Sequence, residues 1–433
     1  MKQEDYYRMM AFINDSHESN IAVYTPAEQT QISEIRQRTA EIESKLRTGT
    51  KDWREKMAAW EESMRQPQPL WSRLSFEDGE LTSGGQKLIP MEDGSLLAQG
   101  DPGINNPTKL TVRTSLTKVG AVQLEMLTDP NLPRGGPGRN IKGGFALSEF
   151  GVELLSDPKA KPVAVKIAGA TADINPPEAP LDLLFGDKKL GDRKTGPIAF
   201  TIDGNTKTAW SVEAGPGLRN QPRKAVFTFA EPVEVPPGAS LRIFLNQQHA
   251  GGTHYNNNLG RFRLTVTEAT NVVADPLPQS VRAILGVPAK QRTRAQVEQV
   301  FSFWRTTVPD WRDANERIEA IWREYPEGST QLVMAHREKP RQTYLLTRGD
   351  FGKPGKAVEP GVPSFLLDLP PNASGDRLTF AKWLIDRKAP TTSRAFVNRV
   401  WQTIFGTGIV ATSEDLGTQA EPPPTLSFLT GLR

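Results

Sequence analysis

Residues 109–127, KLTVRTSLTKVGAVQLEML, contain two short strand-like runs separated by polar residues and a glycine. Runs of this kind recur from residue 71 to residue 270, with Gly, Pro, Asn and Asp between them. About ten short strands with frequent turn residues are typical of an antiparallel sandwich or jelly roll. The sequence therefore predicts a central β-sandwich, of jelly-roll type, over residues 71–270.

The segments on either side of this region have helical spacing instead. Thr25 and Pro26 begin a stretch in which isoleucine and leucine recur three, four or seven residues apart, and a second helical stretch follows it. We therefore expect a helical hairpin or short coiled coil over residues 1–70. Residues 277–433 are expected to form a mostly helical domain with two short strands between 330 and 370. The predicted fold class is multi-domain α+β.

Composition excludes several kinds of site. The 433 residues include 53 basic and 50 acidic side chains, so a net charge of +3 gives little reason to expect a nucleic-acid partner. There is no cysteine, which excludes disulfides, thiolate metal sites and a covalently attached c-type haem in this chain. No apolar run approaches the roughly 18–20 residues of a membrane span, and the first residues do not form a signal peptide.

The stretch 199–210, AFTIDGNTKTAW, is a strand-like run followed by an Asp-Gly-Asn turn. Gly204 can supply the positive φ that a tight turn needs, and its neighbours offer side-chain oxygens of the kind that Ca²⁺ binds. Three alternatives stay open: a turn closed by local hydrogen bonds with Trp210 in the core, a structural calcium site, or direct contact with a ligand. The calcium ligands expected are Asp203, Asn205, Thr208 and a distant carboxylate, either Glu268 or Glu149.

The loop 246–261, NQQHAGGTHYNNNLGR, is the best candidate for ligand contact. Amide and imidazole groups suit hydroxyl-rich ligands, and aromatic rings can stack on sugars. The alternatives are a solvated hairpin loop, a glycan-contacting loop, and a metal site shared by two histidines. The candidate ligand-binding residues are Gln247, Gln248, His249, His254, Tyr255 and Asn256.

The last third of the chain carries the most specific resemblance. The segments 341–366 (RQTYLLTRGDFGKPGKAVEPGVPSFL) and 376–423 (DRLTFAKWLIDRK to DLGTQAEPP) resemble the DUF1553 (PSD1) domain of large planctomycete proteins. Residues 3–18 look like the closing helix of a DUF1549 (PSCyt2) domain, and the β-rich region looks like the insert that separates the two domains. The resemblance implies an extracytoplasmic protein, in the periplasm or cell envelope, with an upstream cytochrome-type domain. It implies no reaction.

A second resemblance concerns the Asp-Gly-Asn turn. The stretch 199–210 is similar to the A-x-DGN-x-x-T-x-W signature of discoidin-like, galactose-binding-like sandwiches, with Thr201 standing where the signature has alanine. The resemblance implies a carbohydrate or another cell-envelope component as partner, and at most a structural Ca²⁺ as cofactor. We therefore expect a non-catalytic binding or scaffold region.

The alternative is part of an enzyme or electron-transfer protein that acts on polysaccharide, its haem domain lying outside this chain. Its site would lie at the junction of the DUF1549-like and DUF1553-like parts. In the DUF1553-like part, RGDF follows a strand and RAFVNRVWQ forms a helix. Two of the helical residues are four positions apart and so share a face. The proposed network, which is either structural or functional, comprises Arg348, Asp350, Arg394 and Asn398.

Overall fold

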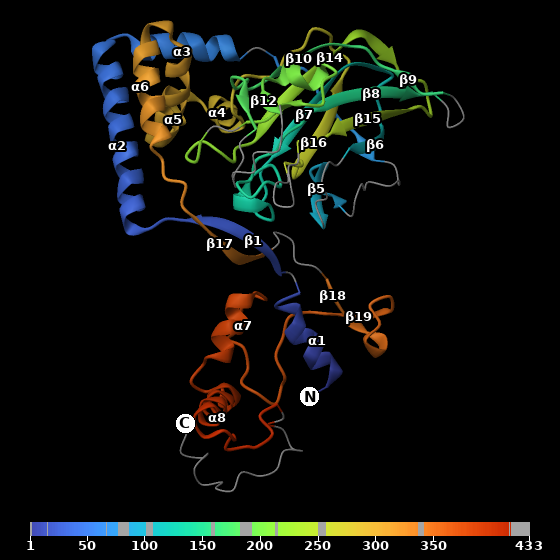
Figure 1. The fold of residues 1–433 in the computed structure, drawn as a ribbon, viewed down its shortest axis with the longest axis vertical. Coiled ribbons are helices and arrows are strands. Elements are labelled where there is room, and N and C mark those ends of the chain that lie inside the picture. The colour runs from blue at the N-terminus through green and yellow to red at the C-terminus, as the bar shows by residue number, and fades with distance from the viewer. Residues whose placement is uncertain are drawn as a thin grey trace. The chain divides into compact units, whose positions relative to one another are not determined.

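The computed structural model describes residues 2–14, 16–65, 67–76, 86–100, 107–156, 161–181, 193–212, 215–249, 257–336, 342–414 and 416. The fold is mixed α+β, as predicted (Figure 1). The chain divides into two compact units. One comprises Glu18–Val333, and the other combines Met1–His17 with Met334–Arg433.

Two antiparallel sheets form most of the β structure of residues 18–333. The seven-stranded sheet has the order β10-β14-β7-β16-β5-β4, with β2 also paired to β16, and the five-stranded sheet has the order β3-β6-β15-β8-β9. The first sheet consists of β2 (Ser72–Arg73), β4 (Gln86–Pro90), β5 (Ser95–Gly100), β7 (Lys118–Leu127), β10 (Ile167–Ala172), β14 (Arg223–Glu234) and β16 (Arg261–Thr267). The second consists of β3 (Ser75–Phe76), β6 (Thr108–Arg113), β8 (Glu149–Leu155), β9 (Val163–Ala164) and β15 (Ser240–Asn246).

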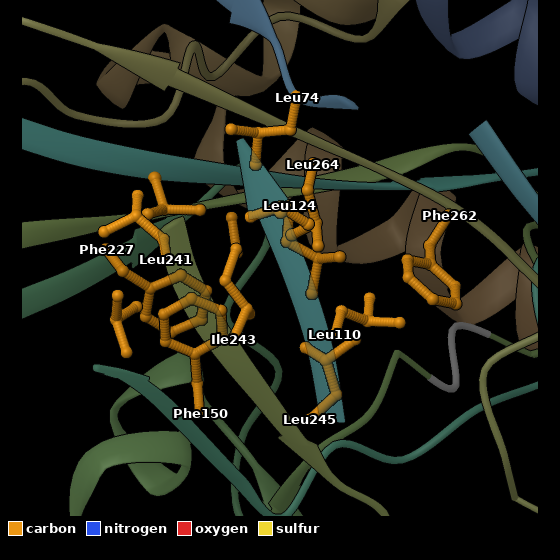
Figure 2. Close-up of a cluster of buried hydrophobic side chains, with 14 of the residues drawn as sticks. Leu74, Leu110, Leu124, Phe150, Phe227, Leu241, Ile243, Leu245, Phe262 and Leu264 are labelled. Atoms are coloured by element: carbon orange, nitrogen blue, oxygen red, sulfur yellow. The ribbon is translucent and has the colours of Figure 1, made fainter. Parts of the chain in front are cut away.

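One hydrophobic core lies between these sheets (Figure 2). Phe150 of β8 and Phe227 of β14 stack across it with ring centroids 3.6 Å apart. In β15, Leu241, Ile243 and Leu245 are fully buried in this core. Because side chains alternate along a strand, the residues between them, such as Phe244, face away from the core.

The Asp-Gly-Asn turn comes just before the last strand of a small three-stranded sheet, which consists of β11 (Ala179–Pro180), β12 (Lys194–Gly196) and β13 (Thr208–Trp210). The strand expected at residues 199–202 is wrong, because Ile198–Ile202 form a 3₁₀ helix. Pro197 precedes the helix, and the hydroxyl of the fully buried Thr201 donates to the Ile198 carbonyl at 2.7 Å. That local hydrogen bond satisfies a polar group inside the core and favours the helical turn over an extended strand.

Helices predicted from the sequence pack together beside these sheets in the same unit. Thr25 caps α2 by accepting a hydrogen bond from the Glu28 backbone. Helix α2 packs mainly against α6, and α3 contacts α5. Phe301 is the centre of an aromatic cluster with Trp53, Trp304 and Trp311. The helices are α2 (Pro26–Gly49), α3 (Trp53–Met64), α4 (Gln279–Leu285), α5 (Arg294–Trp304) and α6 (Arg312–Arg323).

Buried ion pairs connect α2 and α3 to the residues at the two ends of α5. Glu43 of α2 accepts a hydrogen bond from Arg305 at 2.8 Å, and Glu61 of α3 accepts one from Arg292 at 2.7 Å. All four side chains are about nine-tenths buried or more. Loss of one partner would leave an uncompensated buried charge, so breaking either pair would destabilise the fold strongly.

The continuous helix expected from residue 3 to residue 18 is wrong. Helix α1 (Gln3–Ala11) ends before a turn, and β1 (Ser16–Val23) then pairs with β17 (Ser329–His336) in a two-stranded sheet. The partner strand is more than 300 residues away in sequence, so local spacing could not predict this pairing.

In the second unit, α1 packs with the C-terminal part of the chain. Phe12 stacks on Phe380 with ring centroids 5.0 Å apart, and Asn14 donates to the Thr343 hydroxyl at 3.2 Å. The unit also contains β18 (Thr343–Leu346), β19 (Pro354–Val358), α7 (Arg377–Leu384) and α8 (Pro390–Phe405).

Candidate functional site

Local hydrogen bonds close the Asp-Gly-Asn turn. Asp203 Oδ1 accepts from the Asn205 backbone N–H at 2.8 Å, and Gly204 has a φ of +74°. The Thr208 hydroxyl lies 2.7 Å from Asp203 Oδ2 and 2.8 Å from the Asn205 carbonyl, and donates to one of them at a time. Trp210 is fully buried, and its indole N–H donates to the Ile174 carbonyl. Hydrogen bonds within the chain therefore close the turn without any bound ion.

Glu149 is the carboxyl that meets this turn. The backbones of Leu147 and Trp210 exchange two hydrogen bonds of 2.9 Å, which brings the start of β8 beside the turn. The Glu149 carboxyl lies close enough to Asp203 and to the backbone of Gly204 and Asn205 for these groups to influence its pKa. Burial, and then the charge of Asp203, raise the pKa of Glu149 to about 7. The other carboxylate considered, Glu268, is exposed just after β16 ends.

This carboxyl pair is suited to share one proton or to bind a hard cation. Glu149 Oε1 is shielded from solvent and has no hydrogen-bond partner among the described residues. Asp203, the Asn205 carbonyl and the Thr208 hydroxyl add further oxygens, and Ca²⁺ takes six to eight oxygen ligands, several of which can be water. The residues present therefore fit a calcium ion, although the described part of the chain has no cluster of three or more His, Cys, Asp or Glu.

Two residues predicted to contact ligand are buried instead. The Gln247 amide donates to the Thr108 hydroxyl at 2.9 Å and accepts from the Leu259 backbone N–H at 2.6 Å. His249 is fully buried, with Nδ1 3.0 Å from the Ser148 hydroxyl. Its Nε2 lies within 3.1 Å of the carbonyls of two other segments, so this nitrogen bears the proton.

His249 therefore connects neighbouring segments of the fold as a neutral ring. Burial lowers the pKa of His249, which keeps the ring uncharged at neutral pH. Gln248 is half-buried, and its backbone N–H donates to the Ser148 hydroxyl. His254, Tyr255 and Asn256 lie outside the described residues.

Replacing His249 with leucine is expected to lower the free energy of unfolding by about 1–3 kcal/mol, because buried carbonyls lose their donor. Urea unfolding of the whole chain measures this change. The control, Gln248→Ala, should change the free energy by less than about 0.5 kcal/mol. Normal stability of the leucine variant would contradict the structural role of His249.

A pocket lies on the outward face of the five-stranded sheet, beside Glu149. Its volume is about 310 Å³. The pocket was not predicted, although one sequence signal could have found it. In the run SLRIFLNQQ an aromatic residue, Phe244, stands between apolar residues that point inward, directly before the candidate loop. Outward-facing lining residues are Lys109, Phe244, Asn246, Glu149 and Gly151.

The described contacts of the DUF1553-like residues lead to separate partners. Asn398 is buried in α8 and hydrogen-bonds both the N–H and the carbonyl of Val410. Asp350 accepts from the Gly352 backbone and pairs with Lys353 at 3.2 Å. Arg394 and Arg348 are exposed, the latter with a φ of +54°. Asn398 thus fixes the segment that follows α8.

Comparison with known proteins identifies one segment. Residues 376–432 match the PSD1 family model, described as a protein of unknown function (DUF1553). No curated protein and no solved structure matches the chain. Among the described residues, no helix is both long and apolar enough to cross a membrane.

Proposed function

We propose that this chain is a non-catalytic binding or scaffold region of an extracytoplasmic planctomycete protein. In this proposal the two-sheet part is a galactose-binding-like jelly roll that contacts carbohydrate or another component of the cell envelope. In a longer protein, an upstream cytochrome-type domain would supply redox chemistry.

The outward pocket is the observation that supports this function best. Its accessible surface is almost wholly apolar and includes the ring of Phe244, and its lining also contains the polar residues Lys109, Asn246 and Glu149. Small-molecule sites commonly have this combination of apolar surface and a few placed polar groups. Phe244 lies just before the 246–261 loop. An exposed aromatic platform beside this loop would favour a binding module over a structural spacer.

Co-sedimentation of the full chain with insoluble polysaccharides and with purified bacterial envelope tests the proposal. We expect saturable retention that soluble fragments of the same polysaccharide compete away. Retention should also persist in high salt, which screens non-specific charge attraction. Failure to sediment with any of these materials would contradict the binding function.

The enzyme alternative receives less support from the C-terminal unit. A cleft lined by acidic residues and by Arg348, Arg394 and Asn398 would favour it. The Asn398 side chain, however, is buried and bonded at both its amide oxygen and nitrogen to Val410. These bonds favour a structural role for Asn398.

We also propose that the Asp-Gly-Asn turn binds a structural Ca²⁺ with Glu149 as its distant carboxylate. The support is the contact of Glu149 with Asp203 together with the unpartnered buried Oε1. Such an ion would fix the start of β8, and Glu149 also lines the pocket. Calcium would therefore support the binding face without taking part in any reaction.

A further inference from the structure

Cross-strand pairing arranges the pocket residues in two rows. In one row Phe244 of β15 lies between Lys109 of β6 and Gly151 of β8. In the next row Asn246 is paired with Glu149. All five point away from the core, because their neighbours in sequence point into it. Lys109 and Glu149 are thus at diagonally opposite corners of one small surface.

Gly151 leaves the edge of the Phe244 ring uncovered. A Cβ at residue 151 would lie 3.7 Å from Phe244 Cδ2, which is ordinary van der Waals contact. Any longer side chain there would extend over the ring. Glycine is unfavourable in a strand interior, and it often marks a place where a ligand approaches closely. The ring therefore offers an apolar surface on which the C–H face of a sugar can stack.

The second row contains two polar side chains, Asn246 and Glu149, each with one oxygen that lacks a hydrogen-bond partner among the described residues. Asn246 Oδ1 and Glu149 Oε1 are both shielded from solvent without a partner among the described residues. Buried polar atoms in folded proteins nearly always have a partner. Because neither oxygen is exposed to solvent, each side chain must turn toward the pocket before a ligand hydroxyl can reach it, and the missing partner favours that movement.

Lys109 determines the charge that the pocket favours. Its ammonium lies 5.7 Å from the centre of the Phe244 ring, and the side chain is exposed. A cation–π contact at an exposed site is worth only about 0.5–1 kcal/mol, so the ammonium can move to a better partner at little cost. Arg242, on the same face, is already paired with Glu153.

We propose that this pocket binds a sugar ring that bears a carboxylate, as in the uronic acid units of acidic polysaccharides. The ring stacks on Phe244, its carboxylate pairs with Lys109, and its hydroxyls face Asn246 and Glu149. This inference rests on the proposed binding function and assigns it a site and a ligand class.

Isothermal titration of the full chain with galacturonate oligosaccharides and with matched neutral galactose oligosaccharides tests this site. We expect the acidic series to bind about tenfold more tightly, the effect of one added charge-assisted contact. Lys109→Gln should bring the ratio of the two affinities close to one. An unchanged ratio in this variant, or no binding of the acidic series by the natural chain, overturns the inference.

Gly151→Val tests whether the sugar ring stacks on Phe244. The valine side chain would cover the Phe244 ring, and valine is favourable in a strand. We expect it to weaken binding at least about tenfold. Gly169→Val is the matched control, since a Cβ there meets nothing within 4 Å, and it should bind normally. If Gly151→Val unfolds, Phe244→Ala removes the same platform. Undiminished binding in a folded variant would place the sugar elsewhere and leave the co-sedimentation result, and with it the proposed function, intact.

Discussion

Replacing Trp210 with alanine is expected to lower the free energy of unfolding of residues 18–333 by about 3–5 kcal/mol. Trp210 is fully buried, and its ring meets Phe145 edge-on with centroids 5.1 Å apart. Its loss removes this packing and leaves the Ile174 carbonyl without its donor.

Urea unfolding of the whole chain, followed by circular dichroism, measures this loss. Leu70→Ala is the control in the same unit, because the Leu70 side chain is 90% exposed. The control should change the free energy by less than about 0.5 kcal/mol. A loss below about 1 kcal/mol for Trp210→Ala would mean that the ring is not a core residue.

The strands were predictable because their signal is local. Runs such as 109–116 and 121–127 combine apolar residues with flanking turn residues, and they became β6 and β7. The run 199–202 has the same composition but forms a 3₁₀ helix, since four residues are too few to separate the two periodicities. The pairing of β1 with β17 depends on residues more than 300 positions apart.

The candidate site likewise has a local part that the sequence predicts and a long-range part that it does not. Asp203, Asn205 and Thr208 lie within six residues, so their meeting at one turn follows from the sequence. The choice of Glu149 over Glu268 required the backbone bridge to Trp210, which only the tertiary structure provides.

Two buried polar residues differ from their prediction for another reason. Gln247 and His249 have the chemistry of ligand-binding groups, but the fold buries both and satisfies them internally. Sequence does not distinguish a polar residue that meets a ligand from one that meets a buried backbone group. Phe244 is the converse case, an apolar residue that faces away from the core.

Calcium is expected to stabilise the metal-free chain, and to do so more strongly at pH 8 than at pH 5. At about 100 times its dissociation constant, a ligand of the folded state adds about 2.7 kcal/mol. The pKa of Glu149 is raised to about 7 from its ordinary 4.5. Between these values the folded chain holds a proton that the unfolded chain has released. Without metal, stability therefore falls as pH rises through this window.

This decline should be on the order of 1–2 kcal/mol, because partial exposure of Glu149 screens the full effect. Calcium binding must displace the proton on Glu149. The stabilisation by calcium therefore grows as pH rises and this proton is lost. His249 contributes in the opposite direction, since its lowered pKa makes the fold less stable as pH falls below about 6.5. His249 is present both in the natural chain and in Glu149→Gln. Its contribution therefore cancels when the pH profile of stability of one is subtracted from that of the other.

Thermal unfolding in EGTA and in calcium, across this pH range, measures both effects together. Glu149→Gln should lose the calcium shift and flatten the decline, because an amide carries no charge to neutralise. Glu268→Gln is the matched control and should retain both, since Glu268 is exposed and is the other carboxylate that the sequence suggested. A calcium shift that survives in Glu149→Gln but disappears in Glu268→Gln would reverse the assignment of the distant ligand. A calcium shift that both variants retain would place the ion away from the turn, and the contact of Glu149 with Asp203 would then be a proton-sharing pair alone.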